Sequence, residues 1–283
     1  MNGIIVVNKP KGITSRDVVN KVCKILNTKK VGHTGTLDPI ASGTLVLCIG
    51  NATKLVEELT SYDKEYIATV KLGVLTDTLD TTGKVLKTQN LKLKKEELIK
   101  TLNSFIGTYK QEVPIYSAVK INGKKLYEYA RCNIDVTLPK RSVTIHDIEL
   151  LDFNKDNYKF RVKVSKGTYI RSLIKDINDK LNVIGSMEDL IRTKQGMFSL
   201  NDSYTLDNIE NKEYKLISIE EVLKNYNTFT IDEALYKKIK NGAIIDNTYN
   251  ADKIVFKYNN KVIAIYKKYD KDHNKLKPYK MFI

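Results

Sequence analysis

The sequence has no tryptophan and contains three cysteines, three histidines and five prolines among its 283 residues. Cys23, Cys48 and Cys132 are odd in number and show no C-x-x-C spacing. This pattern argues against a disulfide framework or a zinc knuckle and favours a reducing compartment. The histidines are too far apart in sequence to suggest a metal site, so we expect no metal.

Long apolar runs are also missing. No stretch approaches the roughly 18 apolar residues of a membrane span, and the apolar run in MNGIIVVNKPKG is too short for a signal peptide. The phosphate-binding patterns G-x-x-x-x-G-K-[ST] and G-x-G-x-x-G do not occur. We therefore expect a soluble, cytoplasmic protein with no membrane partner.

Positive charge is abundant. Lys and Arg outnumber Asp and Glu by 48 to 33, which gives a net charge of +15. Such a balance favours polyanionic partners, with nucleic acid the first choice. Membrane surfaces, acidic proteins and the lysine-rich composition of an A+T-rich genome are the alternatives. The hydrophobic fraction of 42% is sufficient for a folded core.

The hydrophobic pattern is that of an α+β protein. It predicts strands at 3–8, 45–49, 66–72, 143–152 and 158–165, and an Asn122-Gly123 hairpin. It predicts helices from about 14 to 27, at 53–59, at 92–107 with Gly107 as C-cap, and at 169–181. Residues 231–283 carry twelve lysines against six acidic residues, with two strands around an Asn259-Asn260 turn. We expect a large domain over 1–229 and a small, basic, β-rich domain over 230–283.

Three short stretches carry candidate chemistry. VGHTGTLDPIASG (31–43) contains one carboxylate, Asp38, directly before Pro39; on these residues alone, a capping aspartate in a tight turn is favoured over an active site. KGTYIR (166–171) joins a strand to a helix and offers Arg171 to an anion, or is an ordinary turn with a core tyrosine. Tyr66 begins an alternating strand, where a core role is the commoner one.

Taken together, these stretches resemble the TruB family of tRNA pseudouridine synthases. The matching motifs are VVNKPKGITS (6–15), GHTGTLDPIASG (32–43), DKEYIATVKLGVLTDTLDTTG (63–83), YSAVKINGKKLYEYAR (116–131), SKGTYIRSL (165–173) and DLIRTKQGMF (189–198). They follow the family's order across about 200 residues. The resemblance, and not the spacing, turns Asp38 from a turn residue into a candidate nucleophile.

The resemblance implies an enzyme that converts the T-loop uridine of tRNA, conventionally numbered 55, to pseudouridine without cofactor or metal. It assigns Asp38 as nucleophile and Arg171 as its ion-pair partner, and leaves open attack at the ribose C1′ or elimination to a glycal. Tyr66 would stack on the base and help to remove its C5 proton. Tyr169 would line the base pocket and Leu190 would contact the uracil edge, although DLIRT departs here from the commoner LRR.

The remaining implied roles are supporting ones. His33 would stack where flipped nucleotides leave a gap, Lys9 and Pro10 would buttress the catalytic loop, and Asp80 and Arg192 would orient their neighbours. The resemblance further implies a mainly antiparallel catalytic sheet flanked by helices, an RNA-gripping insertion around 109–140 and an abbreviated PUA-like RNA-binding domain at the C-terminus. We expect a monomer with no obligatory protein partner.

Two other functions compete with this one. The first is a tRNA-folding chaperone role, which is compatible with catalysis in the same protein. The second is the catalytic subunit of a guide-RNA machine, in which we would expect a longer N-terminal extension and a fuller PUA domain.

Overall fold

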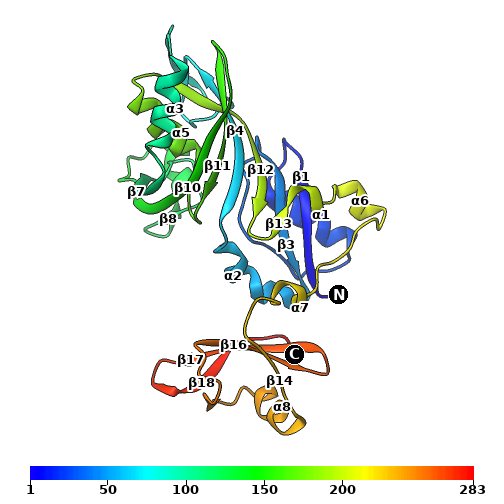
Figure 1. Cartoon of the computed structure of the whole chain (residues 1–283). Coiled ribbons are helices and arrows are strands. Elements are labelled where there is room, and N and C mark those ends of the chain that lie inside the picture. The colour runs from blue at the N-terminus through cyan, green and yellow to red at the C-terminus, as the bar shows by residue number, and fades with distance from the viewer.

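A computed structural model describes residues 1–283, and two β-sheets dominate it (Figure 1). The larger sheet has nine strands, and its main path runs in the order β1-β3-β12-β4-β11-β10-β7. These strands are β1 (Gly3–Lys9), β3 (Ser42–Ile49), β12 (Gly185–Gln195), β4 (Lys64–Leu72), β11 (Asn157–Val164), β10 (Lys140–Phe153) and β7 (Gly107–Glu112). Two short strands complete it: β2 (Val31–His33) pairs with β3, and β13 (Phe198–Ser199) pairs with β12.

All pairs in this sheet are antiparallel except β3 with β12, which run parallel over Ser42–Gly43 and Ile191–Arg192. Their backbones approach closely because Gly43 has no side chain: a Cβ there would lie 2.4 Å from the Arg192 carbonyl oxygen, and its φ is +103°. Only glycine fits such a position without strain. The predicted α+β class with a mainly antiparallel sheet is confirmed.

Helices cover the two halves of the large sheet separately (Figure 1). On β4, β11 and β10 lie α3 (Lys95–Asn103) and α5 (Ile170–Lys180), and α5 buries Ile170, Leu173, Ile174 and Ile177 at helical spacing. The β1–β3 half is covered by α1 (Ser15–Ile25) and α6 (Leu206–Glu210). Thr14 and Asp17 form a capping box that begins α1.

One predicted helix is too long. The pattern at 92–107 forms only α3, which ends at Asn103 with Ser104 as C-cap. Gly107 is therefore not a C-cap: with φ at +115° it begins β7 and pairs with Ile145 of β10. The apolar Phe105 and Ile106, which continued the helical pattern, lie in a turn between α3 and β7, where their N–H groups donate to the Leu102 and Asn103 carbonyls. The turn-rich stretch at 76–84 connects a small hairpin of β5 (Val74–Thr76) and β6 (Val85–Thr88).

The predicted insertion around 109–140 is narrower in the structure. Residues up to Glu112 pair with β10, so the segment that leaves the sheet is 113–139. It contains β8 (Lys120–Ile121), β9 (Lys124–Lys125) and α4 (Leu126–Arg131). The Asn122-Gly123 hairpin is confirmed, with both residues at positive φ as a two-residue turn requires.

The C-terminal sheet has the order β14-β16-β17-β18-β15. Its strands are β14 (Thr228–Thr230), β16 (Lys253–Tyr258), β17 (Lys261–Tyr269), β18 (Asp272–Met281) and β15 (Ile245–Asp246), and α8 (Glu233–Lys240) packs against it. The Asn259-Asn260 turn between β16 and β17 is confirmed, with φ values of 48° and 62°.

This second sheet shares a core with the first. Val255, Ile265 and Phe282 pack in one cluster with residues of β1, β3, the 3-10 turn η1 (Gly50–Leu55), α2 (Val56–Thr60) and α7 (Ile219–Val222). A second 3-10 turn, η2 (Leu200–Asp202), follows β13. None of the helices combines the length and apolar character that crossing a bilayer requires.

Candidate active site

The loop that carries Asp38 is fixed from three sides. The Ser15 hydroxyl donates to the Leu37 carbonyl (3.1 Å) and accepts from the Leu37 N–H (2.8 Å), while the Gly12 N–H donates to the Pro39 carbonyl (2.8 Å). The Ala41 N–H donates to the Asp38 carbonyl (3.0 Å), which closes a β-turn with proline at its second position. The turn suggested by the residues alone is therefore present, and it presents the Asp38 carboxylate.

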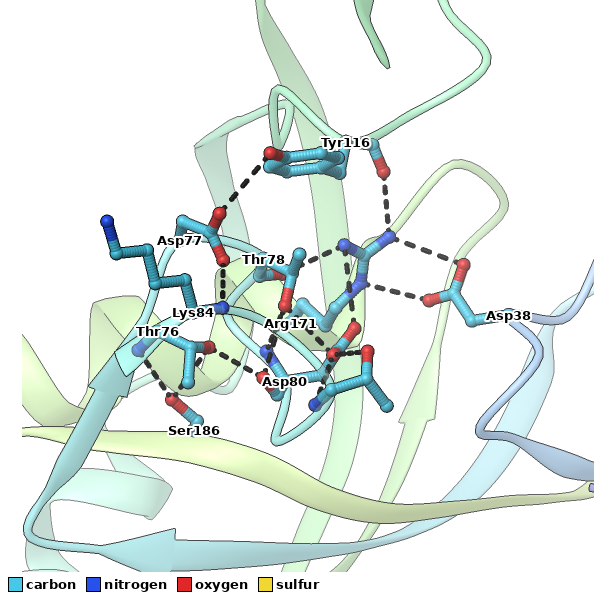
Figure 2. Close-up of polar contacts among 10 residues, drawn as sticks. Asp38, Thr76, Asp77, Thr78, Asp80, Lys84, Tyr116, Arg171 and Ser186 are labelled. Atoms are coloured by element: carbon cyan, nitrogen blue, oxygen red, sulfur yellow. Dashed lines mark hydrogen bonds and ion pairs between the residues drawn. The ribbon is translucent and has the colours of Figure 1, made fainter. Parts of the chain in front are cut away.

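Arg171 meets that carboxylate with two nitrogens (Figure 2). Its Nε lies 2.9 Å from Oδ2 of Asp38, and its Nη2 donates to Oδ1 at 3.3 Å. The arginine side chain is 6% exposed, whereas the aspartate side chain is 39% exposed. A bidentate pair of this kind fixes both position and charge, and it leaves the carboxylate open to an incoming molecule.

The remaining donors of Arg171 are also engaged (Figure 2). Nη1 donates to the Thr78 carbonyl (3.0 Å) and lies 4.0 Å from Oδ2 of Asp80, and Nη2 donates to the Tyr116 carbonyl (2.9 Å). The other oxygen of the buried Asp80 accepts from the Thr78 hydroxyl and from the Thr82 N–H and hydroxyl. The guanidinium plane is thus held by contacts from three separate segments, those of Asp38, of Thr78 with Asp80, and of Tyr116.

Arg171 occupies the second position of α5, where the helix dipole disfavours a cation and favours an anion. Its contacts with Asp38 bring a carboxylate to the only charged side chain of this first turn.

A pocket of about 580 Å³ is lined by Thr36 and Tyr169, which lie two residues before Asp38 and Arg171 respectively, although neither member of the ion pair lines it. Two tyrosines, Tyr66 on β4 and Tyr169 at the start of α5, line it together with Gly35 and Thr36 of the catalytic loop. Four cationic residues also contribute to its lining: Lys64, Arg141, Lys166 and Arg192. Aromatic planes beside cations suit a nucleobase with its phosphates.

Two of those cations are buried and hold backbone carbonyls. Arg192, 1% exposed, donates to the carbonyls of Thr44 (2.6 Å), Gly35 (3.1 Å) and Thr36 (3.4 Å). The Lys64 ammonium donates to two carbonyls of the preceding turn at 2.7 Å each. Burial lowers the pKa of Lys64 to about 8, and the nearby charge of Arg192 acts in the same direction.

Lys9 is a third buried cation and carries no exposed surface. Its ammonium donates to the carbonyls of Pro10 (2.8 Å) and Ile13 (2.7 Å), which shapes the loop whose Gly12 contacts Pro39. Burial lowers the pKa of Lys9 to about 8, against the opposing effect of the Asp38 charge.

His33 and Leu190 lie further from the ion pair. Nδ1 of His33 accepts from the Gly35 N–H (3.3 Å), and burial, with the charges of Arg16 and Arg192, lowers the pKa of the ring. Leu190 is 5% exposed in the core and does not line the pocket, and its N–H donates to the side chain of its neighbour Asp189 (2.7 Å).

Of the residues singled out from the sequence, Asp38, Arg171 and Asp80 meet in one network, and Tyr66, Tyr169 and Arg192 share one pocket. Sequence reasoning missed Lys64 and the carbonyls of Thr78 and Tyr116. No side-chain signal marks a carbonyl, although both lie inside quoted motifs. No group of three or more His, Cys, Asp or Glu side chains is placed to hold a metal ion.

Comparison with known proteins identifies the family of the chain. The sequence model described as "TruB family pseudouridylate synthase (N terminal domain)" matches residues 23–170. The chain is also 42% identical to tRNA pseudouridine synthase B of Bacillus subtilis (strain 168), over 100% of this chain and 98% of that protein. The chain belongs to the TruB family. The tRNA pseudouridine synthase B of Clostridium tetani is 46% identical over 90% of this TruB-family chain and 89% of its own length.

Solved structures show the same fold. A chain in the crystal structure of a Cbf5–Nop10–Gar1 complex superimposes with a TM-score of 0.74 at 25% identity, over 99% of this chain and 85% of that one. A chain in an H/ACA RNP bound to a substrate RNA containing 2′-deoxyuridine gives 0.72 at 24% identity, over 99% and 85%. The TruB-family chain is thus a pseudouridine synthase, an isomerase that acts on RNA.

Proposed function

We propose that this enzyme isomerises uridine 55 in the T loop of tRNA to pseudouridine. The observation that carries the proposal is the bidentate Asp38–Arg171 pair, whose carboxylate is accessible beside a pocket lined by Tyr66 and Tyr169. The relatives named tRNA pseudouridine synthase B favour tRNA over other RNAs as substrate. Such a substrate places the enzyme in the cytoplasm.

The reaction exchanges one bond of the base for another. The N1–C1′ bond breaks and a C5–C1′ bond forms, the C5 proton leaves to solvent, and N1 takes up a proton, so the product has the formula of the substrate. Asp38 can serve as nucleophile at C1′, or it can remove a C2′ proton on the route through a glycal. Either role requires the ionised carboxylate, which Arg171 stabilises once a base excludes water from the site.

The pocket residues receive the base. A T-loop base must leave its stack to reach a nucleophile, at a cost of a few kcal/mol that new stacking contacts offset. Tyr66 is 7% exposed and rigid in β4, which suits stacking and proton removal at C5, and Tyr169 lines the same space. His33, with its lowered pKa, offers a neutral ring to stack where the base has left. The backbone at Leu190 is our candidate contact for the uracil edge.

Supporting residues act through the catalytic loop. Arg192 holds the carbonyls of Gly35 and Thr36, Lys9 and Pro10 shape the loop that contacts Pro39, and Asp80 faces Arg171. In this proposal they hold Asp38 and Arg171 in position relative to each other while RNA binds. The C-terminal sheet would serve as an abbreviated PUA-like domain and the 113–139 segment as an RNA grip, since both carry exposed lysines.

The decisive experiment uses Asp38→Asn and unmodified tRNA tritiated at C5 of uridine. Tritium release measures isomerisation, and filter binding measures affinity. We expect Asp38→Asn to lose release by at least about 10³-fold while its Kd stays within about threefold. Asp63→Asn is a matched control, because that carboxylate is comparably exposed at 43% and pairs with His146 instead. Substantial turnover by Asp38→Asn would refute the nucleophile assignment.

The tritium-release assay and the Asp38→Asn variant also distinguish the two competing functions. Release from an isolated T stem-loop without any added protein or guide RNA argues against a guide-RNA subunit. A tRNA-folding role independent of chemistry predicts that Asp38→Asn still accelerates refolding of misfolded tRNA.

A further inference from the structure

The first turn of α5 carries Arg171 but lacks the usual capping groups. Its N-cap residue, Tyr169, makes no side-chain capping bond, and the third helical position is Ser172, where a capping box has Glu or Gln. The turn contains no acidic residue to offset the arginine at its second position. Something outside the helix must therefore fix where this turn begins.

Gln111 on β7 supplies the missing acceptor. Its Oε1 accepts from the Tyr169 N–H at 2.8 Å, the bond that a capping-box glutamate makes within its own helix. The side chain is 1% exposed, so water does not compete for this contact. Gln111 lies 58 residues away in sequence, on the strand that leads into the 113–139 segment.

The orientation of the Gln111 amide is itself determined. Its Nε2 donates to the Tyr109 hydroxyl (2.7 Å), which donates to Oδ2 of Asp176 (3.1 Å) two turns along α5. With Nε2 committed to the hydroxyl, only Oε1 is left to face Tyr169. Strand β7 thus holds α5 at two points, at its N-cap residue Tyr169 and at Asp176.

We infer that Gln111 is a positioning residue for catalysis, which acts through Tyr169 and Arg171. It fixes the start of the helix turn that directs Tyr169 into the base pocket and Arg171 onto Asp38. This inference rests on the proposed roles of Asp38 and Arg171. A displacement of about 1 Å at reacting groups can reduce a rate by about 100-fold, so one distant amide has a measurable effect.

The test compares two variants of Gln111 in single-turnover reactions with enzyme in excess over tRNA. Gln111→Leu removes the acceptor and is expected to slow isomerisation by about 10- to 100-fold, with Kd for tRNA within about threefold. Gln111→Glu keeps an oxygen at the same place and is expected to remain within about fivefold of the wild type. Arg171 and Asp38 are unchanged in both.

Tyr158→Phe is the matched control for a merely structural effect. The buried Tyr158 hydroxyl also joins a strand to α5, but it donates to Asn178 (2.9 Å) near the far end of the helix. Its loss should lower Tm and leave the single-turnover rate unchanged. The inference is overturned if Gln111→Leu turns over within twofold of the wild type, or if Tyr158→Phe slows the reaction equally. Activity in Asp38→Asn would instead overturn the proposed role of Asp38, and absence of tritium release by the wild type would overturn the proposed function.

Discussion

The two sheets differ in what they bury. Every buried polar or charged residue of the chain precedes residue 196, including Lys9, Lys64, Asp80, Arg171 and Arg192. The core under the C-terminal sheet is built from apolar residues and tyrosine, and its lysines lie at or near the surface. Both sheets are rich in cations, so the difference between them is whether those cations are buried or lie at the surface.

Burying a cation without enough partners costs several kcal/mol, so such groups persist where they are fully bonded. Around the catalytic loop, Arg171, Arg192 and Lys9 each donate to two or more backbone carbonyls. On the C-terminal side, Lys253 and Lys280 pair with Glu58 and Glu57 of α2. Internal cations thus shape a site, and external ones are available for docking and for contact with RNA.

The largest expected effect comes from Arg171→Lys, which keeps the positive charge but removes the planar guanidinium group and its paired N–H donors. An ammonium cannot hold both oxygens of Asp38 and the carbonyls of Thr78 and Tyr116 together. We expect the single-turnover rate, measured by tritium release, to fall by about 10²- to 10³-fold at a temperature at which calorimetry shows the variant to be folded. A rate within tenfold of the wild type would show that charge alone suffices.

Arg192→Lys tests a buried cation that has no carboxylate partner. A single ammonium group cannot replace all three bonds, to the loop carbonyls of Gly35 and Thr36 and to the Thr44 carbonyl of β3, so the unfolding free energy should fall by about 2–4 kcal/mol in urea titrations. Arg161→Lys is the control, because its pairs with Asp147 and Glu149 are at the surface and should contribute about 1 kcal/mol or less. Equal losses of unfolding free energy in both variants would contradict the distinction between buried and surface cations.

The contribution of the buried Lys9 to the stability of the fold depends on pH. Its folded pKa of about 8 is below the ordinary value of 10.5, so the unfolded chain binds more protons between those values and stability rises with pH there. The wild type should therefore gain about 2–3 kcal/mol relative to Lys9→Met between pH 7 and pH 10. Using the difference cancels the parallel effect of Lys64. A constant difference across that range would contradict the assignment.

The smallest effect is expected at the surface. Lys238→Ala with Lys240→Ala removes two exposed charges from α8 and should weaken tRNA binding a few-fold. The slope of log Kd against log salt should fall by about 0.7–0.9 per lost contact, with the rate at saturation unchanged. Lys155→Ala, in the β10–β11 turn, is the exposed control. An unchanged slope in the α8 variant would exclude this helix from the RNA interface.

Much of this arrangement could be predicted from the sequence. Family motifs identified Asp38, Arg171, Tyr66 and Tyr169, and amphipathic spacing found α1 and α5, because both signals are local. The central strand β12 was missed as a strand, since Glu188, Asp189, Arg192 and Lys194 interrupt its apolar pattern.

Other features depend on partners far away in the chain. A glutamine in a strand gives no sign that it caps a helix 58 residues later, as Gln111 does for Tyr169. The glycines on either side of Asp38 also serve different purposes: Gly35 lines the pocket, whereas Gly43 is required by the close approach of β12.

The position of β12 has a consequence for how the enzyme is made. Strands β1 and β3 join the rest of the large sheet only through β12, which is translated more than a hundred residues after both of its neighbours. Until β12 emerges from the ribosome, no strand pairing joins the part of the sheet next to Asp38 to the part that carries Tyr66 and Arg171. The two parts of the site can therefore be joined in one sheet only after β12 has been synthesised.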